Sequence, residues 1–124
     1  MDKLAYNGTS DTPTVILDKE ANKFHFSGKS LPEDVKEFYN PILTWFDDYA
    51  KEPNPKTIVE YKMEYFNTAS SKIILDVLTR LETIKNNGQD VEIHWFYQND
   101  DEDMQEAGEA FSDIIEIPFK LIGY

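Results

Sequence analysis

Hydrophobic residues that alternate with polar ones predict several β-strands along the chain. Residues Thr14–Asp18 and Lys23–Ser27 alternate in this way, and the polar segment between them suits a hairpin turn. The clearest strand is Thr57–Phe66. Its residues on one face are Val59, Tyr61, Met63 and Tyr65. Further strands are expected at Val91–Tyr97 and Ile117–Ile122.

The first helix is predicted by hydrophobic residues spaced three and four apart. It follows the segment Ser30–Glu33, which reads as a capping box: Ser30 caps the helix and Glu33 reaches back. The residues expected on its inner face are Val35, Phe38, Tyr39, Ile42, Trp45, Phe46 and Tyr49. Pro41 lies inside this pattern and is expected to kink the helix or split it near Tyr39.

Two more helices complete the elements, one through Ile73–Ile84 and a short acidic one from Asp100 to about Ile114. The order is then β-β-α-β-α-β-α-β, whose β-α-β units require parallel strands. Because the strands alternate, we expect one sheet face to be wet and the helices to lie mainly on the other. The predicted fold is therefore α/β (α+β), a single domain over 1–124 with one open mixed sheet of about five strands. That architecture is typical of STAS (anti-sigma-factor-antagonist) domains.

The composition narrows the classes of function. The chain has 124 residues, 24 of them acidic against 12 basic, for a formal net charge of −12. An acidic surface repels phosphate backbones and anionic lipids, so neither nucleic acid nor membrane is an expected partner. No cysteine is present to form disulfides or thiolate metal sites. With no secretory signal or spanning segment in the sequence, a cytoplasmic location is expected.

Four short polar side chains crowd the junction between the strand Thr57–Phe66 and the following helix. They are Asn67, Thr68, Ser70 and Ser71. Capping of free helix N–H groups by Asn67, Thr68 or Ser70 is one complete explanation. The same N–H groups and the helix dipole also make this junction the best place in the chain to hold a phosphate. A phosphate on Thr68 would add about −1.5 to −2 charges, and Lys72, one turn later, can pair with it.

The acidic run Asp100, Asp101, Glu102 and Asp103 is the second candidate site. Carboxylates at a helix N-terminus favour the dipole, and this can be their whole role. Alternatively, the run forms a partner-binding edge near Thr68. A third possibility is a divalent metal site, serving a small hydrolase built on Asp100, Asp101 and Asp103. The run lacks the ligand spacing and central glycine of an EF-hand loop, so no metal is expected.

The remaining chemistry-bearing residues do not form a known catalytic motif. His25 and His94 are the only histidines, and each lies on a predicted strand, on the polar face of the sheet. Nucleophile elbows, phosphate-binding Gly-rich loops and zinc-protease motifs are all absent from the sequence. Neither an enzymatic activity nor a cofactor is therefore expected.

Several segments, in order along nearly the whole chain, resemble a known family. They are Thr12-Pro13, Gly28–Glu33, Phe38–Pro41, Tyr65–Lys72, Trp95–Tyr97, Asp100–Met104 and Gly108-Glu109. On these segments the chain is similar to the SiaC-type regulatory phosphoproteins of bacteria. Ala69 departs from the pattern, because many members have serine there, next to the expected phosphate acceptor.

The resemblance implies a partner switch. It places the phosphate acceptor at Thr68, with Asn67, Ser70, Ser71 and Lys72 supporting it. It also implies a Ser/Thr kinase of histidine-kinase-like fold and a metal-dependent Ser/Thr phosphatase. The unphosphorylated form is expected to bind and activate an effector, such as a diguanylate cyclase that makes cyclic di-GMP, and phosphorylation to release it. An acidic protein-binding adaptor without a phospho-switch is the alternative.

Overall fold

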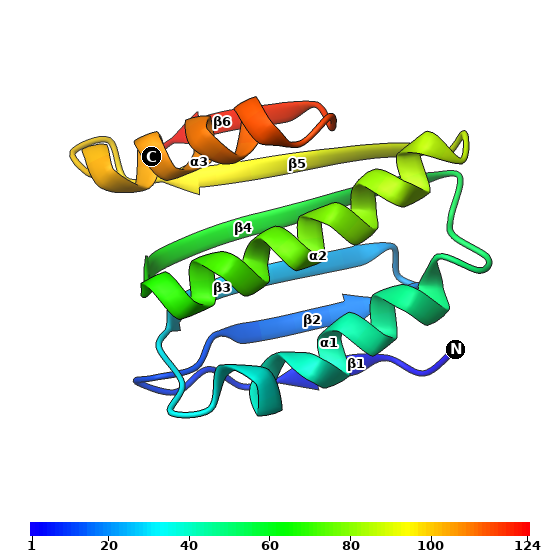
Figure 1. Cartoon of the computed structure of the whole chain (residues 1–124), viewed down its shortest axis with the longest axis horizontal. Coiled ribbons are helices and arrows are strands. Elements are labelled where there is room, and N and C mark those ends of the chain that lie inside the picture. The colour runs from blue at the N-terminus through cyan, green and yellow to red at the C-terminus, as the bar shows by residue number, and fades with distance from the viewer.

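The computed structural model describes all 124 residues and contains one open sheet. Its six strands lie in sequence order (Figure 1). They are β1 (Leu4–Tyr6), β2 (Thr14–Asp18), β3 (Lys23–Ser30), β4 (Lys56–Phe66), β5 (Asp90–Tyr97) and β6 (Phe119–Gly123). The pairs β1–β2 and β2–β3 are antiparallel, and the pairs from β3 to β6 are parallel. The predicted mixed sheet is confirmed, with β1 as an additional edge strand.

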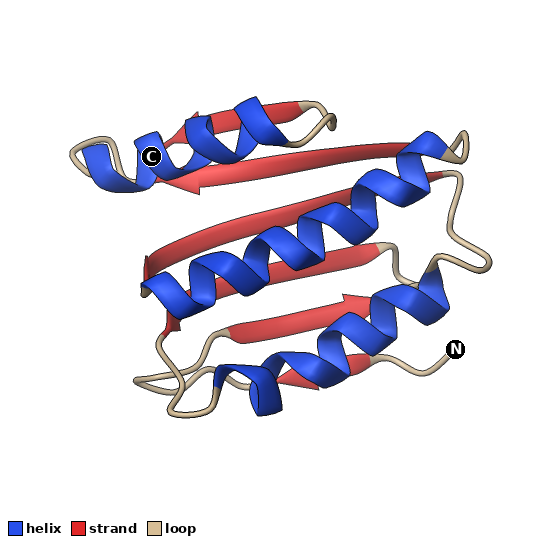
Figure 2. Cartoon of the chain, viewed as in Figure 1, coloured by secondary structure: helices blue, strands red, loops and turns tan.

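All three helices lie on one face of this sheet (Figure 2). They are α1 (Val35–Tyr49), α2 (Thr68–Asn86) and α3 (Glu102–Ile114). Each connects two neighbouring parallel strands, so the carboxyl ends of β3, β4 and β5 lie at the same edge of the sheet, together with the starts of the helices. This edge holds both candidate sites. None of the helices is long and hydrophobic enough to cross a membrane.

The start of α1 differs from the predicted capping box. Asp34 is the N-cap, and its side chain accepts a hydrogen bond from the Glu37 amide at 3.0 Å. Ser30 ends strand β3 instead and is fully buried opposite Phe66 of β4. The capping-box prediction is therefore wrong, because pairing in the sheet extends β3 to Ser30 and leaves a short connection before the helix.

Pro41 does not split α1, which runs without a break from Val35 to Tyr49. A proline here cannot donate a hydrogen bond to the Glu37 carbonyl. Both Pro41 and Glu37 are exposed, so water can satisfy that carbonyl. The buried residues of the helix are Tyr39, Ile42, Trp45, Phe46 and Tyr49. The predicted inner face is thus confirmed as core for these five residues, while Val35 and Phe38 are half-buried and pack against the core.

A β-bulge changes the direction of side chains at the end of β4. Gly28 of β3 pairs with Met63, but Lys29 pairs with Tyr65, which leaves Glu64 as an extra residue. Gly28 has a φ of 95°, a conformation that side-chain-bearing residues rarely adopt. Beyond the bulge Tyr65 is 51% exposed. The prediction that Tyr65 shares the inward face of Met63 is therefore wrong, because a single extra residue inverts the alternation.

The core fills the space between the sheet and the helices with 25 buried hydrophobic residues. Aromatic rings dominate it: Phe26 of β3 stacks on Tyr61 of β4 with ring centroids 4.5 Å apart. In the neighbouring strand β5, the Trp95 indole donates a hydrogen bond to the Met104 carbonyl of α3 at 2.9 Å. The core therefore ties the helix starts to the carboxyl ends of the strands.

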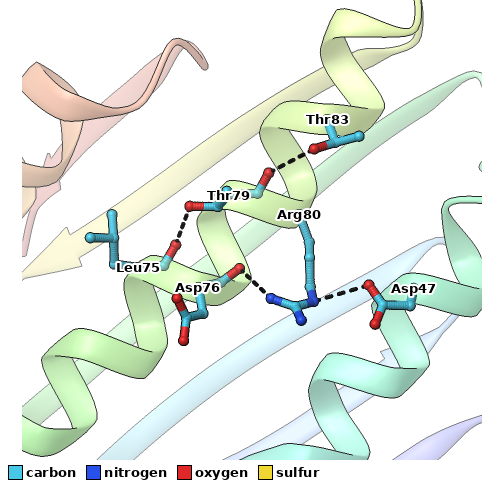
Figure 3. A network of polar contacts seen from close by, with 6 residues as sticks. All are labelled: Asp47, Leu75, Asp76, Thr79, Arg80 and Thr83. Atoms are coloured by element: carbon cyan, nitrogen blue, oxygen red, sulfur yellow. Dashed lines mark hydrogen bonds and ion pairs between the residues drawn. The ribbon is translucent and has the colours of Figure 1, made fainter.

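Helices α1 and α2 are joined across their exposed surface by Arg80. Its Nε donates to Asp47 Oδ1 of α1 at 3.0 Å, and its Nη1 donates to the Asp76 carbonyl at 3.2 Å (Figure 3). Thr79 and Thr83 donate back to carbonyls of their own helix in the same view. An exposed ion pair of this kind contributes little stability, about 0–1 kcal/mol. It nevertheless marks where the two helices are in polar contact.

Candidate functional site

Thr68 is the first residue of α2, directly after the N-cap Asn67. The Asn67 side chain accepts a hydrogen bond from the Ser70 amide at 2.8 Å, so the helix is capped without the Thr68 hydroxyl. The Thr68 side chain is exposed. The sequence allowed Asn67, Thr68 or Ser70 to cap the helix, and the structure shows that Asn67 is the cap. The Thr68 hydroxyl is therefore accessible to another protein.

Ser70 is buried two residues later. Its Oγ donates to the Ser30 carbonyl at 2.8 Å and accepts from Ser30 Oγ at 2.9 Å. The Ser30 hydroxyl also bonds to the Tyr39 hydroxyl at 2.6 Å. Desolvation raises the pKa of Tyr39 to about 12, against the opposing effect of the Ser30 hydrogen bond, so its hydroxyl stays protonated. These hydroxyls fix the start of α2 to β3 and α1.

A groove of about 450 Å³ opens beside Thr68, between α1 and α2. The residues that line it are Val35, Lys36, Thr68, Ala69, Lys72, Ile73 and Asp76. Lys72 follows Thr68 by one helical turn, the spacing at which side chains on a helix are neighbours. Lys36 comes from the first turn of α1. The groove thus combines the exposed threonine with two ammonium groups and one carboxylate.

The acidic run lies on the other side of the β4 end. Asp101 is the N-cap of α3 and accepts from the Met104 amide at 3.0 Å, while Glu102 and Asp103 occupy the first helical turn. A pocket of about 320 Å³ brings Asp101 and Asp103 together with Glu64, Tyr65 and Phe66, the residues that lead into Thr68. The expected nearness of the acidic run to the Thr68 junction is therefore observed.

No group of three or more histidine, aspartate or glutamate side chains is arranged so that it could hold a metal ion. The carboxylates of Asp100, Asp101 and Asp103 line an open hollow with Glu102 and Gln98 and do not converge on one point. The hydrolase alternative therefore has no assembled metal centre to support it. Capping by Asp101 accounts for one member of the run, and Asp100, Glu102 and Asp103 are exposed.

Both histidines lie on the sheet face that the helices leave open, as predicted. His25 Nδ1 lies 3.2 Å from Glu60 Oε1, and His94 Nε2 lies 3.1 Å from Glu92 Oε1. The Lys120 ammonium, 3.1 Å from the same Glu92 oxygen, is the main cause that holds the pKa of Glu92 below its usual value. These charges are separated from Thr68 by the sheet, so neither histidine can act as a base at the threonine.

Comparison with known proteins decides the family. The model of the family described as "SiaC family regulatory phosphoprotein" matches residues 6–124, nearly the whole chain. The chain belongs to the SiaC family of regulatory phosphoproteins. An uncharacterized protein of Pseudomonas aeruginosa (strain UCBPP-PA14) is 27% identical over 121 residues, which cover 98% of this chain and 96% of the relative.

Solved structures of SiaC from Pseudomonas aeruginosa share the whole fold. One matches with a TM-score of 0.92 at 26% identity and covers 100% of both chains. Another is a crystal structure of the diguanylate cyclase SiaD in complex with its activator SiaC. It matches with a TM-score of 0.90 at 26% identity, over 98% of this chain and 99% of that chain. The resemblance to SiaC-type regulatory phosphoproteins seen in the sequence is thus confirmed.

Two features of the candidate site could not be predicted from the sequence. Lys36 has no signal of its own, because only the packing of α1 beside α2 brings it to the Thr68 groove. The burial of Ser70 is the second feature: the sequence offers this residue as a cap or a supporting residue, and the structure shows that it is fully buried. Ser71 is half-buried and Lys72 is exposed. Within this short polar segment, burial alone separates the threonine from the serines.

Proposed function

We propose that this SiaC-family protein is a non-catalytic partner switch controlled by phosphorylation of Thr68. Its unphosphorylated form binds and activates a diguanylate cyclase, and the phosphorylated form releases the enzyme. The observation that supports this most directly is the SiaC–SiaD complex of a relative that shares the entire fold. The choice of Thr68 rests on its exposed hydroxyl at the head of α2, beside a fully buried Ser70.

Two further enzymes belong to the proposal. A Ser/Thr kinase of histidine-kinase-like fold transfers the γ-phosphoryl group of ATP to Thr68 Oγ1, with loss of the hydroxyl proton and release of ADP. A metal-dependent Ser/Thr phosphatase returns the hydroxyl by hydrolysis, releasing inorganic phosphate. All three partners act on the same junction, and we place them with this protein in the cytoplasm. The net charge of −12 favours a cyclase surface that carries basic residues.

The test is the rate of cyclic di-GMP formation by the purified cyclase, with and without this protein. Wild-type protein and Thr68→Ala should both stimulate the enzyme, because the alanine variant cannot be phosphorylated and retains the Asn67 cap. Addition of the kinase and ATP should abolish stimulation by wild-type protein and leave Thr68→Ala active. Equal loss of stimulation for both proteins would contradict a switch at Thr68.

A further inference from the structure

The groove beside Thr68 contains two lysines that have no ionic partner within the protein. The ion pairs of the structure involve Lys51, Lys56, Lys120, Arg80 and the two histidines, but neither Lys36 nor Lys72. Both side chains are exposed and line the same groove of about 450 Å³. In a chain with twice as many acidic as basic residues, two unpaired lysines in one groove are an unusual local charge.

The groove also contains the acceptor of the phosphoryl group, on the proposed function. Thr68 precedes Lys72 by one turn, so their side chains are neighbours on the surface of α2. Lys36 reaches the groove from the facing helix on a long flexible stem. Farther along the two helices, Arg80 pairs with Asp47 of α1 (Figure 3), and neither of these residues lines the groove beside Thr68.

We infer that the groove between α1 and α2 is an intramolecular phosphate site, in which Lys36 and Lys72 bind the phosphoryl group of phosphorylated Thr68. This inference rests on the assignment of Thr68 in the proposed function. A phosphate carries about −1.5 to −2 charges and three strong acceptor oxygens, so it can accept hydrogen bonds from both ammonium groups. The carboxylate of Asp76 also lines the groove, and its negative charge opposes the phosphate.

Occupation of the groove gives phosphorylation a defined effect. In the unphosphorylated protein, Lys36 and Lys72 are free to receive an acidic side chain of a partner. In the phosphorylated protein, the phosphate neutralises the same two ammonium groups. Its effective concentration at the groove is high, because it is covalently attached to Thr68 of α2. The partner then loses a pair of charged contacts.

The second ionisation of the phosphate, measured by ³¹P NMR, tests this inference without any partner. Protein phosphorylated at Thr68 is prepared by semisynthesis, and the ³¹P shift is followed against pH. Two nearby cations favour the dianion, so its pKa should lie below that of the same phosphothreonine in urea-unfolded protein, which is about 6. Lys36→Gln and Lys72→Gln should each raise the pKa by at least ~0.5.

Lys23→Gln is the matched control, because it removes one exposed positive charge from the opposite end of β3. It should leave the phosphate pKa unchanged. A pKa that is lowered equally in the wild type, Lys36→Gln and Lys72→Gln would overturn the inference, since the helix amides alone would then hold the phosphate. An unperturbed pKa in the folded wild type would overturn it as well.

Cyclase binding separates this inference from the proposed function. If the lysine variants raise the phosphate pKa but phosphorylation leaves cyclase affinity unchanged, the groove site stands and the switch fails. If phosphorylation weakens binding while the lysine variants leave the phosphate pKa unchanged, the switch stands and the groove site fails.

Discussion

Thr68, Ser70 and Ser71 lie within one turn of α2, yet they offer a kinase different access. Thr68 is exposed, Ser71 is half-buried, and the Ser70 hydroxyl is enclosed by hydrogen bonds to Ser30. Phosphorylation of Ser70 would require the start of α2 to leave β3, which breaks these bonds. The difference between the three hydroxyls is therefore a difference in burial rather than in sequence context.

Phosphopeptide mapping of the protein isolated from its own cells should find phosphate on Thr68, with Ser70 and Ser71 unmodified. The physical reason is that Thr68 is the exposed member of the three, while Ser71 is half-buried and the Ser70 hydroxyl is enclosed by hydrogen bonds. The measurement is tandem mass spectrometry of the peptide that spans α2's first turn. Phosphate on either serine with Thr68 unmodified would disprove the assignment.

The N-cap and the acceptor can be separated by mutation. Asn67→Ala removes the side chain that accepts from the Ser70 amide and should lower the free energy of unfolding by ~1 kcal/mol. Thr68→Ala removes an exposed side chain from the first turn of α2 and should change the free energy of unfolding by less than ~0.5 kcal/mol. Urea denaturation of both variants checks this. A larger loss for Thr68→Ala than for Asn67→Ala would show that the threonine supports the helix.

At the scale of elements, the hydrophobic pattern predicts α1 through α3 and β2 through β6, because each buries a periodic face. β1 has only the residues Leu4–Tyr6, too few for a recognisable alternation. The capping box at Ser30 and the inward direction of Tyr65 were both wrong for the same reason. The pairing between β3 and β4, including the bulge at Glu64, determines the secondary structure of Ser30 and the side-chain direction of Tyr65. Such pairing cannot be recognised in the local sequence.

The close packing of α3 on β5 depends on Gly108. A Cβ atom there would lie 2.5 Å from Trp95 Cδ1 and 2.7 Å from Leu121 Cδ2. Gly108→Ala should therefore push α3 and its acidic N-terminus away from the sheet and cost ~1–3 kcal/mol in the free energy of unfolding. Glu109→Ala, an exposed change in the same helix, is the control and should stay within ~0.5 kcal/mol. Equal denaturation midpoints for the two variants would contradict this packing.

At the scale of the whole molecule, the arrangement at one sheet edge explains how a single phosphate can matter. Thr68 lies between the lysine-bearing groove on the α1 side and the acidic pocket on the α3 side. The assembly of these surfaces needs the parallel order β3-β4-β5, which the sequence predicts through its β-α-β units. The side chains that meet there, Lys36 above all, follow only from the packing of helices on the sheet.

Phosphorylation should change this surface without refolding the domain. The helix α2 is already specified by its buried face, and added negative charge at its N-terminus stabilises it by ~0.3–1 kcal/mol. Amide chemical shifts of the two forms should therefore differ around residues 67–72, at the start of α1 and in the acidic run. Widespread changes through the β2–β3 hairpin and the C-terminal half of α1 would instead indicate a global rearrangement.

On the proposed function, phosphate on Thr68 releases the effector. Titration calorimetry of the purified diguanylate cyclase with unphosphorylated, Thr68-phosphorylated and Thr68→Ala protein measures it directly. The unphosphorylated and alanine proteins should bind with the same affinity, and phosphorylation should weaken binding at least tenfold, which corresponds to ~1.4 kcal/mol or more. Equal affinities for the phosphorylated and unphosphorylated proteins would contradict it.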